Sequence, residues 1–157
     1  MEAAQKYRVT AAWGSGRTGL TISSSAPNAI QFTAPPEFGG LEGRWTPEDL
    51  LLSAVASCYT TTFYALAERS NLEYADLEVE VEGWVRKTDS GYAFKGIVIR
   101  PNLTIFSEGD RPRGLLLLQK AKSVCLVARA LAVEQKFEPH VQAGESRVEF
   151  SQVLPAV

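Results

Sequence analysis

Hydrophobic and polar positions change their spacing several times along the chain. Between Leu50 and Ala67 almost every side chain is apolar or small, as in the run Leu50-Leu51-Leu52-Ser53-Ala54-Val55-Ala56-Ser57-Cys58. No face of such a segment is left for water, so it predicts a central buried helix over about Pro47–Ser70. An N-cap candidate, a proline and two acidic residues mark its start: Thr46, Pro47, Glu48 and Asp49.

Other segments show the period of two that is typical of strands. From Leu77 to Val85 apolar residues alternate mainly with acidic ones, which predicts a strand with one wet face. Shorter strands are expected at Lys6–Trp13, Leu20–Ser24, Ile30–Thr33, Phe94–Ile99, Leu103–Phe106 and Glu145–Val153. A second apolar helix, with Cys125 in its middle, is expected from about Arg113 to Glu134. This order predicts an α+β fold in which two long buried helices pack on antiparallel sheets.

Glycine and proline divide these elements. The segment Gly14-Ser15-Gly16-Arg17-Thr18-Gly19 predicts a tight turn that carries Arg17, and Pro35-Pro36-Glu37-Phe38-Gly39-Gly40 predicts a shaped loop. A hairpin is expected through Thr88-Asp89-Ser90-Gly91, and a break in the sheet at Pro101-Asn102.

Composition limits the class of protein. A chain of 157 residues with 45% apolar and 22% charged residues can bury one core, so a single domain over residues 1–157 is expected. Its net charge of -2, with both signs interleaved, offers no basic patch for nucleic acid and no polybasic membrane anchor. The start is unlike a signal peptide, and no stretch approaches about 20 apolar residues. A cytoplasmic protein without a membrane segment is therefore expected.

A helix that is apolar on all sides is difficult for so short a chain to cover. A homodimer that buries both helices would resolve this difficulty, so a homodimer is expected.

The chain has two cysteines, Cys58 and Cys125, which are too few for a disulfide scaffold. On adjacent buried helices they could approach within the roughly 7 Å between Cα atoms that a disulfide needs. Two small core hydrophobes are an equal alternative. Metal binding is disfavoured because His140 is the only histidine and no second cysteine lies at ligand spacing from either Cys58 or Cys125.

A reactive Cys58 must ionise, and burial among apolar residues opposes this unless a positive charge is near. Arg17 is the first candidate, with Glu48 as a partner that could hold it, and Arg44 is the second candidate. Glu48 precedes Cys58 by ten positions, which is about 15 Å along one helix. If Glu48 belongs to the same site as Cys58, it must come from the partner subunit of an intertwined dimer.

These residues resemble the osmotically inducible protein C and organic hydroperoxide resistance (OsmC/Ohr) family. The similarity rests on Trp45-Thr46-Pro47-Glu48-Asp49-Leu50, Ser57-Cys58 and Ala121-Lys122-Ser123-Val124-Cys125, with the Pro36–Gly40 loop and the Gly16–Gly19 turn. It extends from about residue 6 to residue 153. Two departures are Leu126, where many members have proline, and Glu42-Gly43-Arg44-Trp45, where the hydroperoxide branch commonly has small residues and asparagine.

The resemblance implies an intertwined α+β homodimer that acts as a thiol-dependent peroxidase in oxidative-stress defence. Cys58 would attack an organic hydroperoxide and become a sulfenic acid, which Cys125 would resolve as a disulfide. Arg17 and Glu48 would keep the thiolate charged and orient the peroxide. A thiol reductant such as a dihydrolipoyl group would restore the thiols, with no permanently bound metal or organic cofactor.

Two alternatives remain at this level. A dimeric binding protein could hold a lipid-like ligand between the helices and the Pro35–Gly40 loop, with the cysteines as core residues. A long helix wrapped by sheet also resembles hotdog thioesterases, which use a carboxylate with a helix dipole. Peroxide turnover that depends on Cys58 would separate the peroxidase from both.

Overall fold

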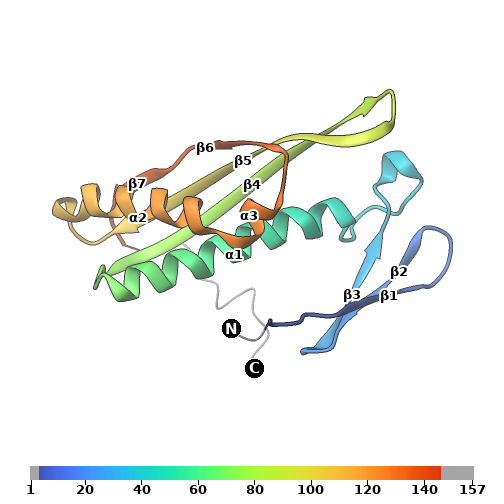
Figure 1. Cartoon of the computed structure of the whole chain (residues 1–157), viewed down its shortest axis with the longest axis horizontal. Coiled ribbons are helices and arrows are strands. Elements are labelled where there is room, and N and C mark those ends of the chain that lie inside the picture. Colours follow the sequence, from blue (N-terminus) through green and yellow to red (C-terminus); the bar gives the residue numbers. More distant parts are fainter. Residues whose placement is uncertain (1–3, 146–157) are drawn as a thin grey trace. The chain divides into compact units, whose positions relative to one another are not determined.

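The computed structural model describes residues 4–145 (Figure 1). These residues divide into two compact units, one that ends at Leu51 and one that begins at Leu52. The first contains β1 (Val9–Trp13), β2 (Thr18–Ser23), β3 (Ala26–Thr33), the short 3-10 helix η1 (Pro36–Phe38) and the start of α1 (Pro47–Arg69). The described part of the second holds most of α1, then β4 (Tyr74–Thr88), β5 (Gly91–Ile105), η2 (Glu108–Asp110), α2 (Arg111–Val124), α3 (Leu126–Ala130), β6 (Glu134–Phe137) and β7 (His140–Ala143).

The N-terminal unit is a three-stranded antiparallel meander in the order β1-β2-β3. Its strands and the turn between β1 and β2 confirm the sequence-based prediction. Gly19 pairs with Phe32 across the sheet, and a Cβ on Gly19 would lie 2.7 Å from the Phe32 ring. The aromatic ring therefore needs glycine as its neighbour.

Helix α1 begins as the sequence predicts, at a capping box. The Thr46 hydroxyl accepts a hydrogen bond from the Asp49 amide at 3.1 Å, and the Asp49 carboxylate accepts from the Thr46 amide at 2.9 Å. These reciprocal bonds satisfy amides that a helix start leaves without partners.

The prediction that α1 leaves no face for water is wrong for the single chain. One row of side chains is buried, at the helical spacing of four: Val55, Tyr59, Phe63 and Ala67. Ser57, Thr60, Thr61 and Tyr64 are exposed. By length and composition α1 could also cross a membrane, contrary to the expectation from sequence, although core helices of soluble proteins pass the same test.

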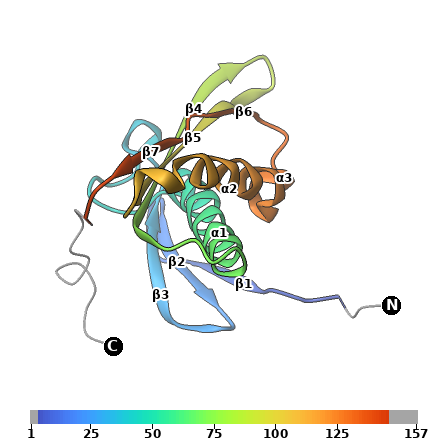
Figure 2. The same ribbon diagram turned by 90° about the vertical axis from the view of Figure 1, so that its left-hand side faces the viewer.

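The main sheet of the second unit is built on β5. It pairs antiparallel with β4, and parallel with β6 and β7. Helices α1 and α2 lie on one face of this sheet, as Figures 1 and 2 show together. The core between helices and sheet is formed by buried aliphatic and aromatic side chains, among them Tyr59, Phe63, Ile97, Ile99, Leu103, Ile105 and Leu118.

The alternation predicted for β4 is confirmed. Leu77, Val79 and Val81 pack against the core, whereas the intervening glutamates are exposed. Arg100 on β5 forms ion pairs of 2.6, 2.9 and 2.9 Å with carboxylates of β4 and of the segment after β6: Glu80, Glu82 and Glu138.

The break that the sequence predicts at Pro101-Asn102 is wrong. β5 continues through both residues, because β6 pairs with β5 up to Ile99 and β7 pairs from Asn102 onward. The missing N–H of Pro101 therefore lies at the gap between the two parallel partners, where no ladder bond is lost.

The strands β6 and β7 were not predicted, and their parallel pairing corrects the expectation of purely antiparallel sheets. The predicted strand Glu145–Val153 lies, beyond Glu145, outside the described residues. Glu145 itself is not in a strand.

The second predicted helix is also corrected. Instead of one helix over Arg113–Glu134, α2 ends at Val124 and α3 begins at Leu126. Cys125 lies at the junction in a non-helical conformation, with φ -59° and ψ 113°. The sequence contains neither glycine nor proline at this point, so the apolar pattern continues through the break without a signal.

Candidate functional site

The C-terminal unit brings the two cysteines together. Cys58 is half-buried on α1, and Cys125 is buried at the α2–α3 junction. Neither forms a disulfide in this structure. Each cysteine affects the other's ionisation through a hydrogen bond between their side chains. The sequence left contact between the two cysteines open, and the structure brings them together, with Cys125 at a helix junction and not in a helix middle.

Cys58 is the more acidic of the pair. Burial is the largest influence and opposes its ionisation, but hydrogen bonds together lower the pKa of its thiol below the ordinary value of 9.0. The groups responsible are, in descending order, the Val127 backbone, the Cys125 thiol, the Thr62 side chain and the Leu126 backbone.

Cys125 shows the opposite behaviour. Burial raises the pKa of its thiol, and both the hydrogen bond and the charge of Cys58 raise it further. Cys125 therefore keeps its proton when Cys58 is ionised, and it donates that proton toward the Cys58 sulfur.

The break at Cys125 explains how backbone groups reach Cys58. The first amides of a helix have no acceptor within that helix, so the start of α3 leaves the amides of Leu126 and Val127 available for another partner. A continuous helix would have directed these amides to carbonyls one turn earlier. The junction thus creates the environment that favours a Cys58 thiolate.

These contributors to the site were missed from the sequence. Thr62 follows Cys58 by four positions, which is the spacing of neighbours on one helix face and could have been recognised. The amides of Leu126 and Val127 had no such signal, because residues that break helices are absent there.

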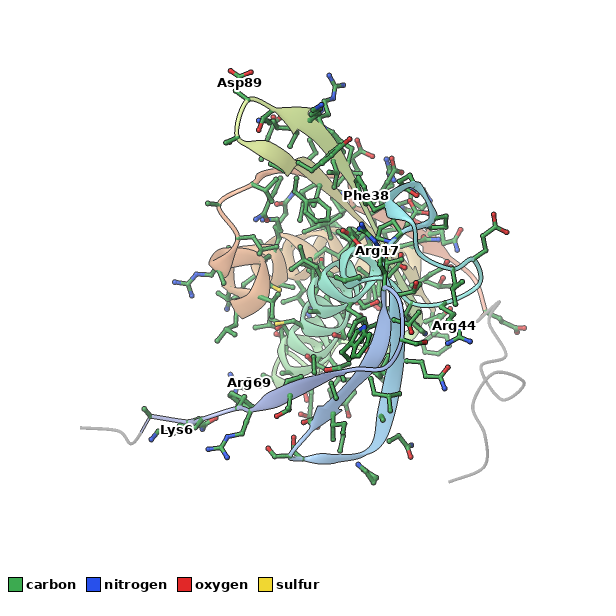
Figure 3. All side chains as sticks on the ribbon, turned by 90° about the vertical axis from the view of Figure 1, so that its right-hand side faces the viewer. Lys6, Arg17, Phe38, Arg44, Arg69 and Asp89 are labelled. Carbon is green, nitrogen blue, oxygen red and sulfur yellow. The ribbon has the colours of Figure 1, made fainter. Side chains whose placement is uncertain are left out.

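The N-terminal unit contains the other two predicted site residues. Arg17 lies on the turn before β2, and its backbone carbonyl accepts a hydrogen bond from the Ala34 amide at 2.9 Å. Its side chain runs alongside Gly39, where a Cβ would lie 3.5 Å from Arg17 Nε. Figure 3 labels Arg17 together with Phe38, the residue before Gly39. Gly39 itself has φ of 83°, a conformation that favours glycine.

The predicted turn and loop thus meet within this unit. They line a hollow of about 200 Å³, whose residues are Ser15, Gly16, Arg17, Thr18, Gly39, Gly40 and Leu41. At Gly40 the loop backbone lies so close to Ala34 that a Cβ would be 1.5 Å from the Ala34 carbonyl oxygen, so this position requires glycine.

Arg17 and Glu48 do not form an ion pair with each other in this unit. The Glu48 Oε2 atom is buried without a hydrogen-bond partner among the described residues. Arg44, the second candidate cation, donates to the Gln31 side chain at 3.3 Å. The roles predicted for Arg17 and Glu48 toward Cys58 stay predictions.

Within residues 4–145, no group of three or more histidine, cysteine, aspartate and glutamate side chains is arranged to hold a metal ion. The chemistry that this site can offer on its own is that of a thiolate beside a thiol.

Comparison with known proteins identifies the family of this chain. The sequence model of the OsmC-like protein family matches residues 40–140. The chain belongs to the OsmC-like family. A curated relative, the uncharacterized protein YmaD of Bacillus subtilis, is 32% identical over 143 residues, which cover 88% of this chain and 95% of YmaD.

Solved structures share the fold of this OsmC-like chain. An OsmC-like protein of unknown function from Vibrio cholerae has a TM-score of 0.77 at 16% identity, over 87% of this chain and 99% of its own. The organic hydroperoxide resistance protein OhrB of Bacillus subtilis has a TM-score of 0.64 at 22% identity, over 89% of this chain and 100% of its own. The expected α+β class and the family resemblance are thereby confirmed.

Proposed function

We propose that this OsmC-like chain takes part in resistance to peroxides, and that it does so as a thiol-dependent peroxidase for organic hydroperoxides. The observation that carries the proposal is the asymmetry of the two adjacent cysteines. Cys58 has a lowered pKa, while Cys125 beside it remains a thiol. This is the arrangement that a two-cysteine peroxidase needs, because the thiolate is the nucleophile and a neighbouring thiol must resolve its oxidised form. The shared fold with OhrB, an organic hydroperoxide resistance protein, supports the choice of substrate class.

The proposed reaction has three balanced steps. The Cys58 thiolate attacks the terminal oxygen of the hydroperoxide, the O–O bond breaks, and the alkoxide takes up a proton and leaves as an alcohol. The Cys125 sulfur then attacks the Cys58 sulfenic acid, which forms a disulfide and releases water. Two thiols of a reductant, for which a dihydrolipoyl group is a candidate, finally reduce the disulfide.

In this proposal Arg17 and Glu48 orient the peroxide and support the charge that develops on its oxygens. The buried Glu48 Oε2, which has no hydrogen-bond partner within residues 4–145, is consistent with a carboxylate whose partner is supplied on assembly. We propose an intertwined homodimer for this reason, acting in the cytoplasm without nucleic acid or membrane.

The test compares wild type, Cys58→Ser and Cys125→Ser for consumption of tert-butyl hydroperoxide with a dithiol reductant. Ser57→Ala, an exposed neighbour on α1, is the matched control. We expect Cys58→Ser to abolish turnover and one equivalent of peroxide to remove two free thiols from the wild type. Turnover that survives Cys58→Ser, or slow thiol loss that is equal in all variants, would reject the proposal and favour a binding protein.

A further inference from the structure

The side chain of Gln135 connects β6 to α3. Its amide nitrogen donates to the Ala128 carbonyl at 2.7 Å and to the Leu131 carbonyl at 3.3 Å. Ala128 is the middle residue of α3 and Leu131 follows its last residue, while the start of α3 carries the amides of Leu126 and Val127 that act on Cys58.

Helix α3 has only five residues, so it cannot hold its own conformation without outside contacts. Gln135 supplies such a contact from a strand that is itself fixed, since Gln135 pairs with Ile97 in the parallel ladder of β5. Ile97 is fully buried in the core. The chain of contacts therefore runs from the sheet through one amide group to the helix beside Cys58.

The carbonyl end of the Gln135 side-chain amide indicates that glutamine contributes here through its N–H donors. Its carbonyl oxygen, Oε1, is buried and has no hydrogen-bond partner among the described residues. A buried acceptor without a partner is unfavourable, and an apolar side chain of similar length would avoid that cost. What glutamine provides here, and such a side chain would not, is the pair of N–H donors directed at α3.

We propose that Gln135 is a positioning residue that holds α3 so that the Leu126 and Val127 amides face the Cys58 sulfur. The inference rests on the proposed function only for its importance to peroxide turnover. Its direct effect, a Cys58 thiol that ionises more readily, can be measured without any peroxide.

The experiment measures alkylation of Cys58 by iodoacetamide as a function of pH in the full chain, with modified Cys58 quantified by mass spectrometry. Gln135→Met keeps the length of the side chain and removes both donors. Gln142→Met is the matched control, because Gln142 is also half-buried and donates its amide at 3.2 Å, but to the Thr104 hydroxyl of β5.

At neutral pH the alkylation rate follows the fraction of thiolate, so loss of the Gln135 donors should slow it about fivefold, with the full rate recovered at high pH. Gln142→Met should leave the profile unchanged. Gln135→Glu, which also lacks donors and adds a negative charge near the Ala128 carbonyl, should slow alkylation at least as much and covers the case in which the methionine variant does not fold.

Unchanged profiles in the folded Gln135 variants, or equal shifts for Gln135 and Gln142, would overturn the inference. If the wild type does not reduce organic hydroperoxides and Gln135→Met still slows Cys58 alkylation, the proposed function fails while the positioning role of Gln135 stands.

Discussion

At the scale of single residues, neutral hydrogen-bond donors lower the pKa of the Cys58 thiol. Burial of the sulfur favours the thiol, and the donors around it favour the thiolate strongly enough to reverse the balance. Because none of these donors carries a full charge, each makes only a part of the effect, and the loss of any one of them should raise the pKa of Cys58.

The pH dependence follows from the lowered pKa of Cys58. As pH rises through that pKa, the thiolate fraction and the rate of peroxide reduction should rise together and then level off. Since the pKa lies below the ordinary thiol value of 9.0, the plateau should be reached at a lower pH than for a free thiol. Stopped-flow rates under single-turnover conditions would measure this, and a pH profile whose midpoint lies at or above 9.0 would contradict it.

Thr62 provides a test of a single donor. Thr62→Val keeps the shape of the side chain and removes the hydroxyl, so the pKa of Cys58 should rise and the rate at neutral pH should fall by roughly twofold to fivefold. Thr60→Val is the control, because the exposed Thr60 hydroxyl bonds the Ala56 carbonyl within α1 at 2.9 Å. Absorbance of the thiolate at 240 nm across pH gives the shift, and equal effects of the two variants would argue against a role for Thr62.

At the scale of elements, α1 and α2 are joined by one buried hydrogen bond beside the cysteines. The Tyr59 hydroxyl donates to the Leu118 carbonyl at 2.9 Å. Burial, and secondarily the charge of Cys125, raises the pKa of Tyr59, so the hydroxyl stays protonated and remains a donor.

Tyr59→Phe should therefore lower the free energy of unfolding by about 1 kcal/mol, which is the usual net value of one such bond. Tyr64→Phe is a control on the same helix, because Tyr64 is 57% exposed and its change should be close to neutral. Urea denaturation followed by circular dichroism would measure both. A Tyr59 variant as stable as the Tyr64 variant would show that this bond contributes nothing net.

Elements that depend on local signals could be predicted from the sequence, and elements that depend on distant contacts could not. The α1 start was predicted because Thr46, Pro47 and Asp49 are local signals that act within one turn. The β4 alternation was predicted because one face is wet. The break at Cys125 was not predicted, because the junction contains neither glycine nor proline to mark it.

The same limit applies to the strands after α3. Glu134–Phe137 and His140–Ala143 are only four residues each, and their pairing partner is some 38 residues earlier in the chain. Periodicity over four residues cannot distinguish a strand from a loop. For the site, two apolar helices made contact between the cysteines possible without deciding it, whereas the backbone donors to Cys58 had no signal in the sequence.

At the scale of the whole molecule, the proposed dimer determines which chain supplies Glu48 to a given Cys58. On the continuous helix α1 the two positions are about 15 Å apart along the axis, which favours donation by a second subunit. Light scattering should then give a particle of twice the chain mass of 17.1 kDa.

Subunit mixing tests this arrangement directly. Glu48→Gln and Cys58→Ser should each be inactive alone, but a mixed dimer would combine an intact Cys58 from one chain with an intact Glu48 from the other. Refolding the two variants together in equal amounts should restore about a quarter of the wild-type turnover, because half of the dimers are mixed and each has one intact site. No recovery, with mixed dimers present by mass spectrometry, would place both residues in one chain.

The parallel pairing of β6 with β5 has a further consequence for the order of folding. The β4–β5 hairpin closes through a turn of two residues, whereas β6 can reach Ile97 only after the whole segment containing α2 and α3 has been placed. Contacts between distant parts of a chain generally form late. During refolding, rapid alkylation of Cys58 should therefore return later than most of the helical signal. In a chain that is still being synthesised, Cys58 would stay a weakly reactive thiol until β6 and β7 had paired with β5.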